Sequence, residues 1–185
     1  MKKNLFVFFI FFAAAVFAGA QNAALRAIIH HYAARNFLPG AIKQSDLNQI
    51  IQAGVNAPSA RNAQPWHFTV VENAELARRI ISNNVDGNVI IVISAPGDGK
   101  TNTAEILDCA LAAQSIYLAA QALGLGSRIY TGPVAAINQN LKAELGLPGG
   151  HSVVVVVRIG KVEQVDAASA ASSRKPAESI VTYKR

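Results

Sequence analysis

The chain has 185 residues, of which 51% are hydrophobic and 15% charged, and its formal net charge at pH 7 is +6. That length suits one domain with one substantial core, and the scattered basic residues lack the aromatic-interleaved stripe typical of nucleic-acid binding. Cys109 is the one cysteine, so an intrachain disulfide is excluded. It lies in an apolar helical stretch, where we expect a buried, inert thiol.

The first twenty residues have the pattern of a secretory signal peptide. Lys2 and Lys3 precede an apolar run at 5–17, and residues 18–20 give the small-x-small sequence of a cleavage site. The run is shorter than the ~20 residues of a membrane-spanning helix, although a retained N-terminal anchor is the alternative. We expect cleavage after Ala20 and a periplasmic or secreted domain at 21–185, without stable membrane association.

Helices and strands alternate along this domain. Helices are expected at residues 22–32, 45–55, 74–81, 103–123 and 135–145, and strands at 67–71, 88–94, 127–130 and 152–159. Ser45 is expected to cap the second helix. The helix at 103–123 is apolar on almost every face, which predicts a central, buried helix. The order predicts three layers around one sheet, with a surface tail at 165–175 and an extended piece at 180–183.

A rigid, polar-edged loop is expected at residues 57–68, between a helix and a strand. Two prolines remove backbone donors there, while Ser59, Asn62 and Gln64 project hydrogen-bonding groups. Such a loop suits the edge of a planar heteroaromatic ligand. The alternative from the residues alone is a surface connection with a packed Trp66.

Residues 94–101 imitate a phosphate-binding P-loop, but the pattern fails. A P-loop requires Gly where Ser94 stands, and no later strand ends in an Asp that could coordinate Mg²⁺. We expect a polar turn with glycines at positive φ.

The four histidines, at positions 30, 31, 67 and 151, lack metal-ligand spacing, and no nucleophilic triad is visible. The sequence therefore predicts neither a metal site nor a catalytic side chain.

The loop at 57–68 resembles the Pro-Ser-x-x-Asn-x-Gln-Pro-Trp segment of FMN-dependent nitroreductases. Four further stretches are similar to that family in the right order: residues 31–37, 108–126, 141–160 and 173–180. The resemblance implies an α+β fold of three layers, α/β/α, with a central mixed sheet. It also implies an intertwined homodimer with the flavin at the subunit interface.

The resemblance also assigns residues to FMN. Arg35 and Arg174 match the positions that hold the phosphate, and guanidinium suits phosphate through bidentate hydrogen bonds. Ser59 and Asn62 match contacts to the flavin ring. His31 stands where the family has Arg, and Ala33 where it has Ser, although His31 can still donate to phosphate.

The implied activity is reduction of FMN by NAD(P)H or another donor, followed by reduction of a small aromatic acceptor such as a nitroaromatic or a quinone. The flavin would carry the electron chemistry, so a missing catalytic side chain is expected. The alternative is an exported flavin- or ligand-binding module without physiological turnover. His31, Ala33 and the scarcity of reduced nicotinamides outside the cytoplasm favour that alternative.

Overall fold

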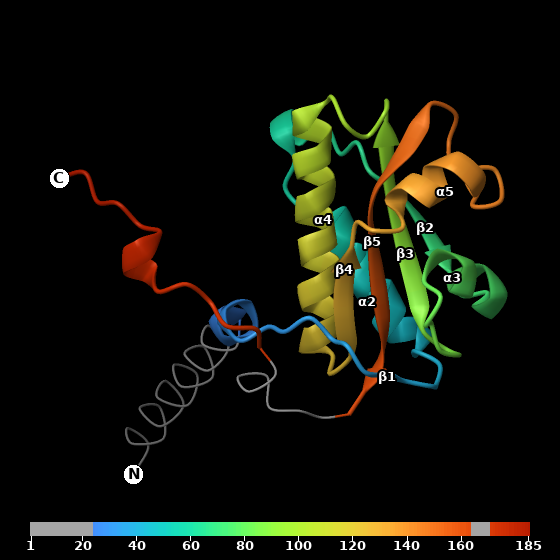
Figure 1. Cartoon of the computed structure of the whole chain (residues 1–185), viewed down its shortest axis with the longest axis horizontal. Coiled ribbons are helices and arrows are strands. Elements are labelled where there is room, and N and C mark those ends of the chain that lie inside the picture. The colour runs from blue at the N-terminus through green and yellow to red at the C-terminus, as the bar shows by residue number, and fades with distance from the viewer. Residues whose placement is uncertain (1–23, 164–170) are drawn as a thin grey trace, which may run out of the picture.

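The computed structural model describes residues 24–163 and 171–185, so the expected signal peptide at 1–20 lies outside the described residues. Two pairs of helices enclose a five-stranded sheet (Figure 1). Its strands are β1 (Phe37–Leu38), β2 (His67–Val71), β3 (Val89–Pro96), β4 (Gly126–Tyr130) and β5 (His151–Val162). None of the helices in the described residues is both long and apolar enough to span a bilayer.

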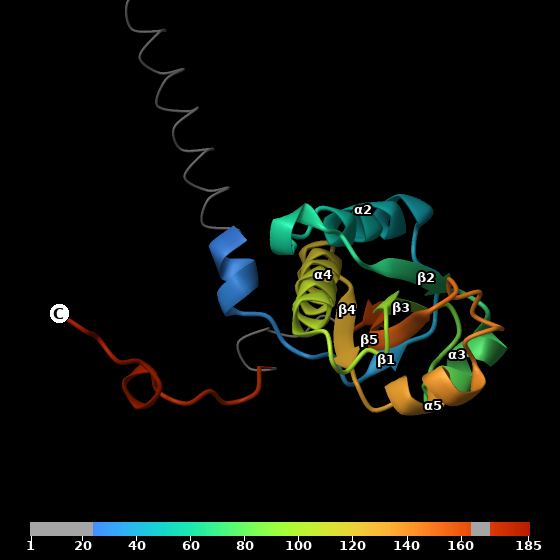
Figure 2. The same cartoon turned by 90° about the horizontal axis from the view of Figure 1, so that it is seen from above.

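The helices form the two outer layers. One face of the sheet carries α2 (Gln44–Val55) and α4 (Thr103–Ala122), and the other carries α3 (Ala74–Ile80) and α5 (Val134–Asn140), as Figure 2 shows. β3 is buried from Val89 to Ala95 because it is covered on both faces. The expected three-layer α/β/α arrangement is therefore confirmed.

The sheet is antiparallel in every pairing among the described residues, so the expected mixed sheet is wrong. α4 does carry the chain from the end of β3 to the start of β4, as a parallel crossover would. β5 lies between these two strands and runs antiparallel to both. Local sequence does not reveal this insertion, because it depends on a strand that comes later in the chain.

Three helix boundaries differ from the sequence expectation. The helix expected at 22–32 ends at Ile29, and residues 31–36 have no regular structure. The residue preceding α2 is Lys43, so Ser45 lies inside the helix and its hydroxyl bonds Asp46 instead of capping. α5 ends at Asn140 rather than at 145. Leu141 and Leu145 are nevertheless buried, in the turns that follow, so the apolar spacing predicted burial correctly but not the backbone.

The C-terminal segment leaves the body of the fold (Figures 1 and 2). A short 3₁₀ helix at Ala177–Ser179 precedes residues without regular structure, so the expected extended piece at 180–183 forms no strand. Ile180 is 66% exposed and Tyr183 79%. Most of the tail expected at 165–175 lies outside the described residues.

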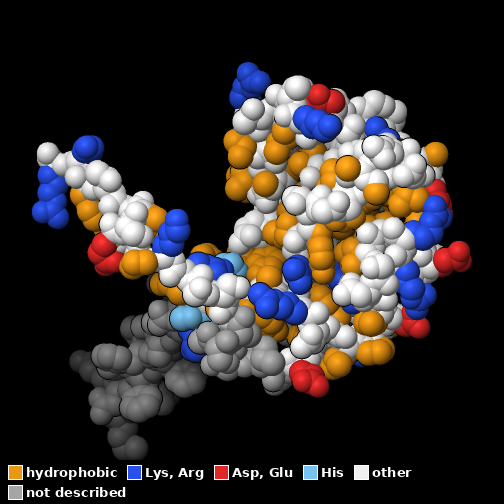
Figure 3. Space-filling model, viewed as in Figure 1, with side chains coloured by type: hydrophobic (Ala, Val, Ile, Leu, Met, Phe, Trp, Pro, Cys, Tyr) orange, Lys and Arg blue, Asp and Glu red, His pale blue; other side chains and the backbone are white. Residues whose placement is uncertain are grey.

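α4 is buried on one side only. Its inner face packs on the sheet through Cys109, Ala113 and Ile116, whereas Leu107 is 58% and Leu111 44% exposed. The expectation of a fully buried helix is therefore wrong for a single chain. Hydrophobic side chains gather along this outer edge in Figure 3.

The turn that imitates a P-loop is closed by its own carboxylate. Asp98 Oδ1 accepts hydrogen bonds from the backbone N–H of Lys100 at 2.8 Å and of Thr101 at 2.9 Å. These bonds hold the pKa of Asp98 below its ordinary value. Gly97 and Gly99 have φ of 92° and 68°. The predicted polar turn is confirmed, and these two donors are taken by Asp98.

Candidate functional site

The residues assigned to a site by sequence fall into two groups at opposite ends of α4. Asp108, near its start, contacts the loop that carries Ser59 and Asn62, whereas Tyr117 contacts His31 further along. At ~1.5 Å per residue, Asp108 and Tyr117 are about 13 Å apart along the helix axis. Figure 1 shows the loop beside one end of α4 and the N-terminal segment beside the other.

The loop at the start of α4 has an unusual backbone. Arg61, Asn62 and Gln64 all have positive φ, at 54°, 56° and 47°. Non-glycine residues adopt this region rarely, at about 1 kcal/mol or more each, and such strain persists only where the surroundings enforce it. The loop is therefore held in a specific shape.

Two hydrogen bonds enforce that shape. The buried carboxylate of Asp108 accepts from the backbone N–H of Ala60 at 2.9 Å, and the Ser59 hydroxyl accepts from the backbone N–H of Gln64 at 3.1 Å. Ser59 thus supports the loop from within. The Asn62 side chain is exposed and has no hydrogen-bond partner in residues 24–163 or 171–185, so its amide can still donate and accept.

Trp66, at the end of the loop, packs against the core and stacks on Phe68, with ring centroids 6.3 Å apart. The packed tryptophan expected for a plain surface connection is therefore present. The strained, braced backbone before it goes beyond what such a connection needs.

At the other end of α4, His31 is oriented by Tyr117. Its Nδ1 lies 3.1 Å from the Tyr117 hydroxyl, and the two rings are nearly perpendicular, at 82°. Burial raises the pKa of Tyr117, and the nearby charge of Arg174 acts in the opposite direction. Within residues 24–163 and 171–185 the His31 ring forms its hydrogen bond through Nδ1, which leaves Nε2 for another partner.

The segment after His31 is held in an extended path. Tyr32 exchanges two hydrogen bonds with the Gln121 side chain, through its N–H at 3.2 Å and its carbonyl at 2.9 Å. The backbone N–H of Ala34 donates to the carbonyl of Ser127 at 3.0 Å. Arg35 follows directly and is exposed.

The basic residues at this end have no acidic partner in the described parts of the chain. The ion pairs that the described residues form are those of Arg78 with Asp86 and of Arg79 with Glu144, and neither involves a residue of this end. Among the described residues, the exposed Arg174 donates to two carbonyls of its own segment, those of Ser172 and Ser173. Basic and histidine side chains gather where the C-terminal segment meets the body (Figure 3). This end can bind an anion.

Three residues that build the site were missed by sequence reasoning: Asp108, Tyr117 and Gln121. All three lie on α4, which is apolar along most of its length, so its sequence reads as a core helix and not as part of a binding site. Asp108 and Gln121 are polar residues in a helix of mainly apolar residues. They were the signal that could have found two of the three, because polar groups removed from water need partners.

Comparisons with known proteins agree with these observations. A family model described as the nitroreductase family matches residues 28–86 and 85–161. A candidate NADH dehydrogenase/NAD(P)H nitroreductase of Archaeoglobus fulgidus is 33% identical over 129 residues, which cover 64% of this chain and 74% of that protein.

Solved structures share the fold. A nitroreductase of Desulfitobacterium hafniense with bound FMN superposes with a TM-score of 0.72 at 24% identity, covering 88% of this chain and 98% of that one. An NADPH:FMN oxidoreductase of Vibrio harveyi complexed with NAD⁺ superposes with a TM-score of 0.74 at 22% identity, covering 88% and 77%. At these identities the likeness shows the fold.

Proposed function

Because the chain belongs to the nitroreductase family, we propose that it is an FMN-dependent oxidoreductase that takes electrons from NAD(P)H and passes them to a small aromatic acceptor, a nitroaromatic, a quinone or a similar molecule. The observation that carries this proposal is the pairing of a strained polar loop with a basic end that has no acidic partner in the described residues. The loop, His31 and Arg35 lie on stretches that the family model matches, and Arg174 lies beyond them. Bound FMN would supply the electron chemistry, which predicts ping-pong kinetics.

The basic end fits the FMN phosphate. Arg35 and Arg174 offer guanidinium groups that suit phosphate through paired hydrogen bonds. His31 adds a donor on a ring that Tyr117 orients, which offsets the missing Arg of the family pattern. Ala33 is exposed and offers no hydroxyl, so this phosphate site has one donor fewer than the family pattern.

The strained loop fits the edge of the flavin ring. The Asn62 amide can both donate and accept, as the alternating polar atoms of that edge require. Ser59 contributes mainly by bracing the loop, because its hydroxyl already accepts from Gln64. Asp108 positions both residues from the interior. The chain's own role is thus to bind and orient, with no side chain needed for chemistry.

We propose that a second copy of the chain completes the site, since one copy keeps the two groups at opposite ends of α4. Antiparallel packing of two α4 helices would bring the start of one beside the end of the other. The exposed Leu107 and Leu111 give α4 an apolar face for this contact, and Ile180 and Tyr183 give the C-terminal segment apolar side chains to bury. Such a homodimer would contain two sites, each built from both chains.

A binding module without turnover is the second candidate. The departures at His31 and Ala33 favour it, because they leave the phosphate end with one permanent charge and one hydroxyl fewer than the family pattern.

We also propose that the protein is exported, on the pattern of residues 1–20. Cell fractionation and N-terminal sequencing test that export, with cleavage after Ala20 expected.

A spectroscopic titration separates the two candidates. Purified protein is saturated with FMN, freed of excess flavin and mixed with NAD(P)H without oxygen. Bleaching of the flavin absorbance, followed by its recovery when a quinone or nitroaromatic is added, supports the oxidoreductase. Flavin that dithionite bleaches but NAD(P)H does not would support the binding module. Protein that takes up no FMN contradicts both.

A further inference from the structure

Arg158 of β5 is a buried cation without a carboxylate partner in residues 24–163 or 171–185. It is 1% exposed, its Nε donates to Asn88 Oδ1 at 3.0 Å, and its Nη1 donates to Asn83 Oδ1 at 3.2 Å. Its guanidinium carbon lies 4.1 Å from the centroid of the Phe37 ring. Burial lowers the pKa of this guanidinium, which reflects the cost of keeping the charge away from water.

The surroundings increase that cost. Arg128 of β4 is directly opposite Arg158 in the sheet, and like charges in this position destabilise a strand pair. Arg128 stacks over Tyr130, at 5.1 Å from the ring centroid. Even a buried ion pair can often be replaced by hydrophobic residues without loss of stability, and Arg158 has no carboxylate partner in the described residues to offset its cost. Core packing alone therefore does not account for Arg158.

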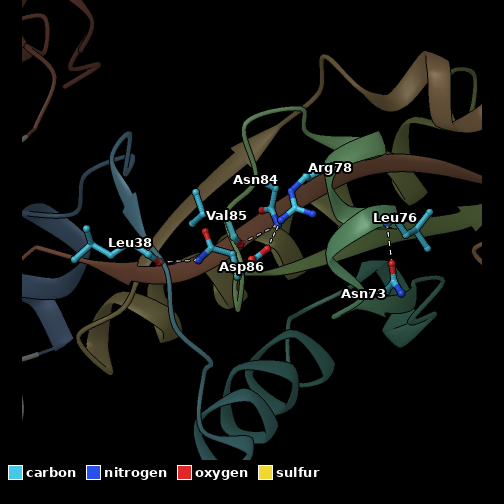
Figure 4. A network of polar contacts seen from close by, with 8 residues as sticks. Leu38, Asn73, Leu76, Arg78, Asn84, Val85 and Asp86 are labelled. Carbon is cyan, nitrogen blue, oxygen red and sulfur yellow. Dashed lines mark hydrogen bonds and ion pairs between the residues drawn. The ribbon is translucent and has the colours of Figure 1, made fainter.

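What Arg158 provides is a connection to β1. It covers the Phe37 ring and orients Asn88, whose Nδ2 donates to the Leu38 carbonyl at 3.1 Å. Figure 4 shows Leu38 beside the turn that carries Val85 and Asp86. β1 has only two residues paired with β5, so these side-chain contacts supply much of its attachment.

Gly160 makes the arrangement possible. A Cβ at this position would lie 2.5 Å from Cγ and Nδ2 of Asn88, well inside contact distance. The Asn88 amide therefore lies directly over the glycine, between β5 and Leu38. A side chain at position 160 would displace Asn88 and leave the Arg158 charge in place.

We propose that Arg158 is a positioning residue for Arg35. Arg35 lies between two anchors, the bond from Ala34 to Ser127 on one side and the Phe37–Leu38 strand on the other. Arg158, through Phe37 and Asn88, fixes the second anchor, so that the Arg35 guanidinium is held ready for a phosphate. This inference rests on the proposed FMN function, in which Arg35 binds the phosphate.

The test compares Arg158→Met with Arg128→Met, which removes the opposite cation on the same face, a cation that stacks on Tyr130 of its own strand. Hydrogen exchange of residues 34–38 is measured in the flavin-free protein, and FMN affinity is measured by titration. In Arg158→Met we expect exchange to quicken and FMN affinity to fall, each by about tenfold. Arg128→Met should leave both near the parent values.

Gly160→Ala provides an independent variant in which the charge is retained. It should reproduce both effects, because Asn88 loses its place. Unchanged exchange at 34–38 in Arg158→Met and in Gly160→Ala overturns the anchoring of β1. Faster exchange with parental FMN affinity overturns the link to Arg35. Failure of the parent to bind FMN overturns the proposed function instead, and exchange in the flavin-free protein still decides the role of Arg158.

Discussion

The Asp108 carboxylate on α4 accepts a hydrogen bond from the backbone N–H of Ala60 at 2.9 Å, across 48 positions of sequence. This bond braces a loop with three residues at positive φ. Asp108→Ala should lower the free energy of unfolding by about 1.5–3 kcal/mol, the usual contribution of a hydrogen bond to a charged group. Urea denaturation measures the change.

Asp108→Asn is the matched control because it keeps an oxygen at the same place. It should lose clearly less stability than Asp108→Ala. Equal losses in the two variants would mean that the position is sensitive to volume or charge, and that the bond to Ala60 does not hold the loop.

Cys109 should be unreactive in the native protein. Its side chain is fully buried, and burial, followed by the nearby charges of Asp108 and Glu105, raises the pKa of its thiol to about 12. The thiolate that reacts with disulfide reagents is therefore scarce at pH 8. Ellman's reagent should detect no thiol per chain in buffer and one in denaturant. Rapid reaction of the native protein would contradict this burial.

His151 should make the protein sensitive to acid. Burial, then the neighbouring His67, lowers the pKa of His151, with Glu105 opposing and Lys142 adding to the effect. The unfolded chain therefore binds the proton more readily, and stability is lost as pH falls from about 6.5 toward the folded-state pKa. The midpoint of thermal unfolding should fall over this range.

His151→Gln removes that titration, so its unfolding midpoint should fall less between pH 7 and pH 5 than the parent's. The comparison is made within each protein, which cancels any constant cost of the substitution. Parallel pH profiles for the two proteins would show that His151 contributes nothing to the acid sensitivity.

Arg174→Ala should weaken FMN binding without affecting the fold. Arg174 is exposed, and its hydrogen bonds within the described residues go to carbonyls of its own segment, so its loss should leave the flavin-free unfolding midpoint near the parent's. Loss of a charged hydrogen-bonded pair with phosphate should cost about 1.5–3 kcal/mol, a tenfold or greater loss of affinity. Lys175→Ala, the adjacent exposed cation, is the control and should retain most of the affinity.

The layers of the fold could be predicted from the sequence because their signals are local. The β-branched runs of β3 and β5 and the helical spacing of α2 depend only on neighbouring residues. The position of β5 between β3 and β4 could not be predicted in this way. Nor could the strand β1, whose two residues pair with residues 161 and 162. Pairing across such separations is set by tertiary contacts.

The assignment of site residues to FMN rests on the family resemblance and stays a prediction. The resemblance assigned His31, Arg35, Ser59, Asn62 and Arg174, and the structure places the described contacts of these residues in two groups. It could not indicate that Tyr117 orients His31, because the two are 86 positions apart. Nor could it show that Ser59 accepts from Gln64 within its own loop, since that bond requires the strained backbone.

The central claim, that each FMN site is shared by two chains, is tested by mixing two variants in one dimer. Arg174→Ala damages the residues that bind the phosphate, and Asn62→Ala damages those that bind the flavin ring. Each variant homodimer should therefore bind FMN weakly. A heterodimer purified with two affinity tags has one intact site and one doubly damaged site if the groups come from different chains. We predict one FMN per heterodimer at parental affinity. Binding as weak as in both homodimers would contradict the shared site.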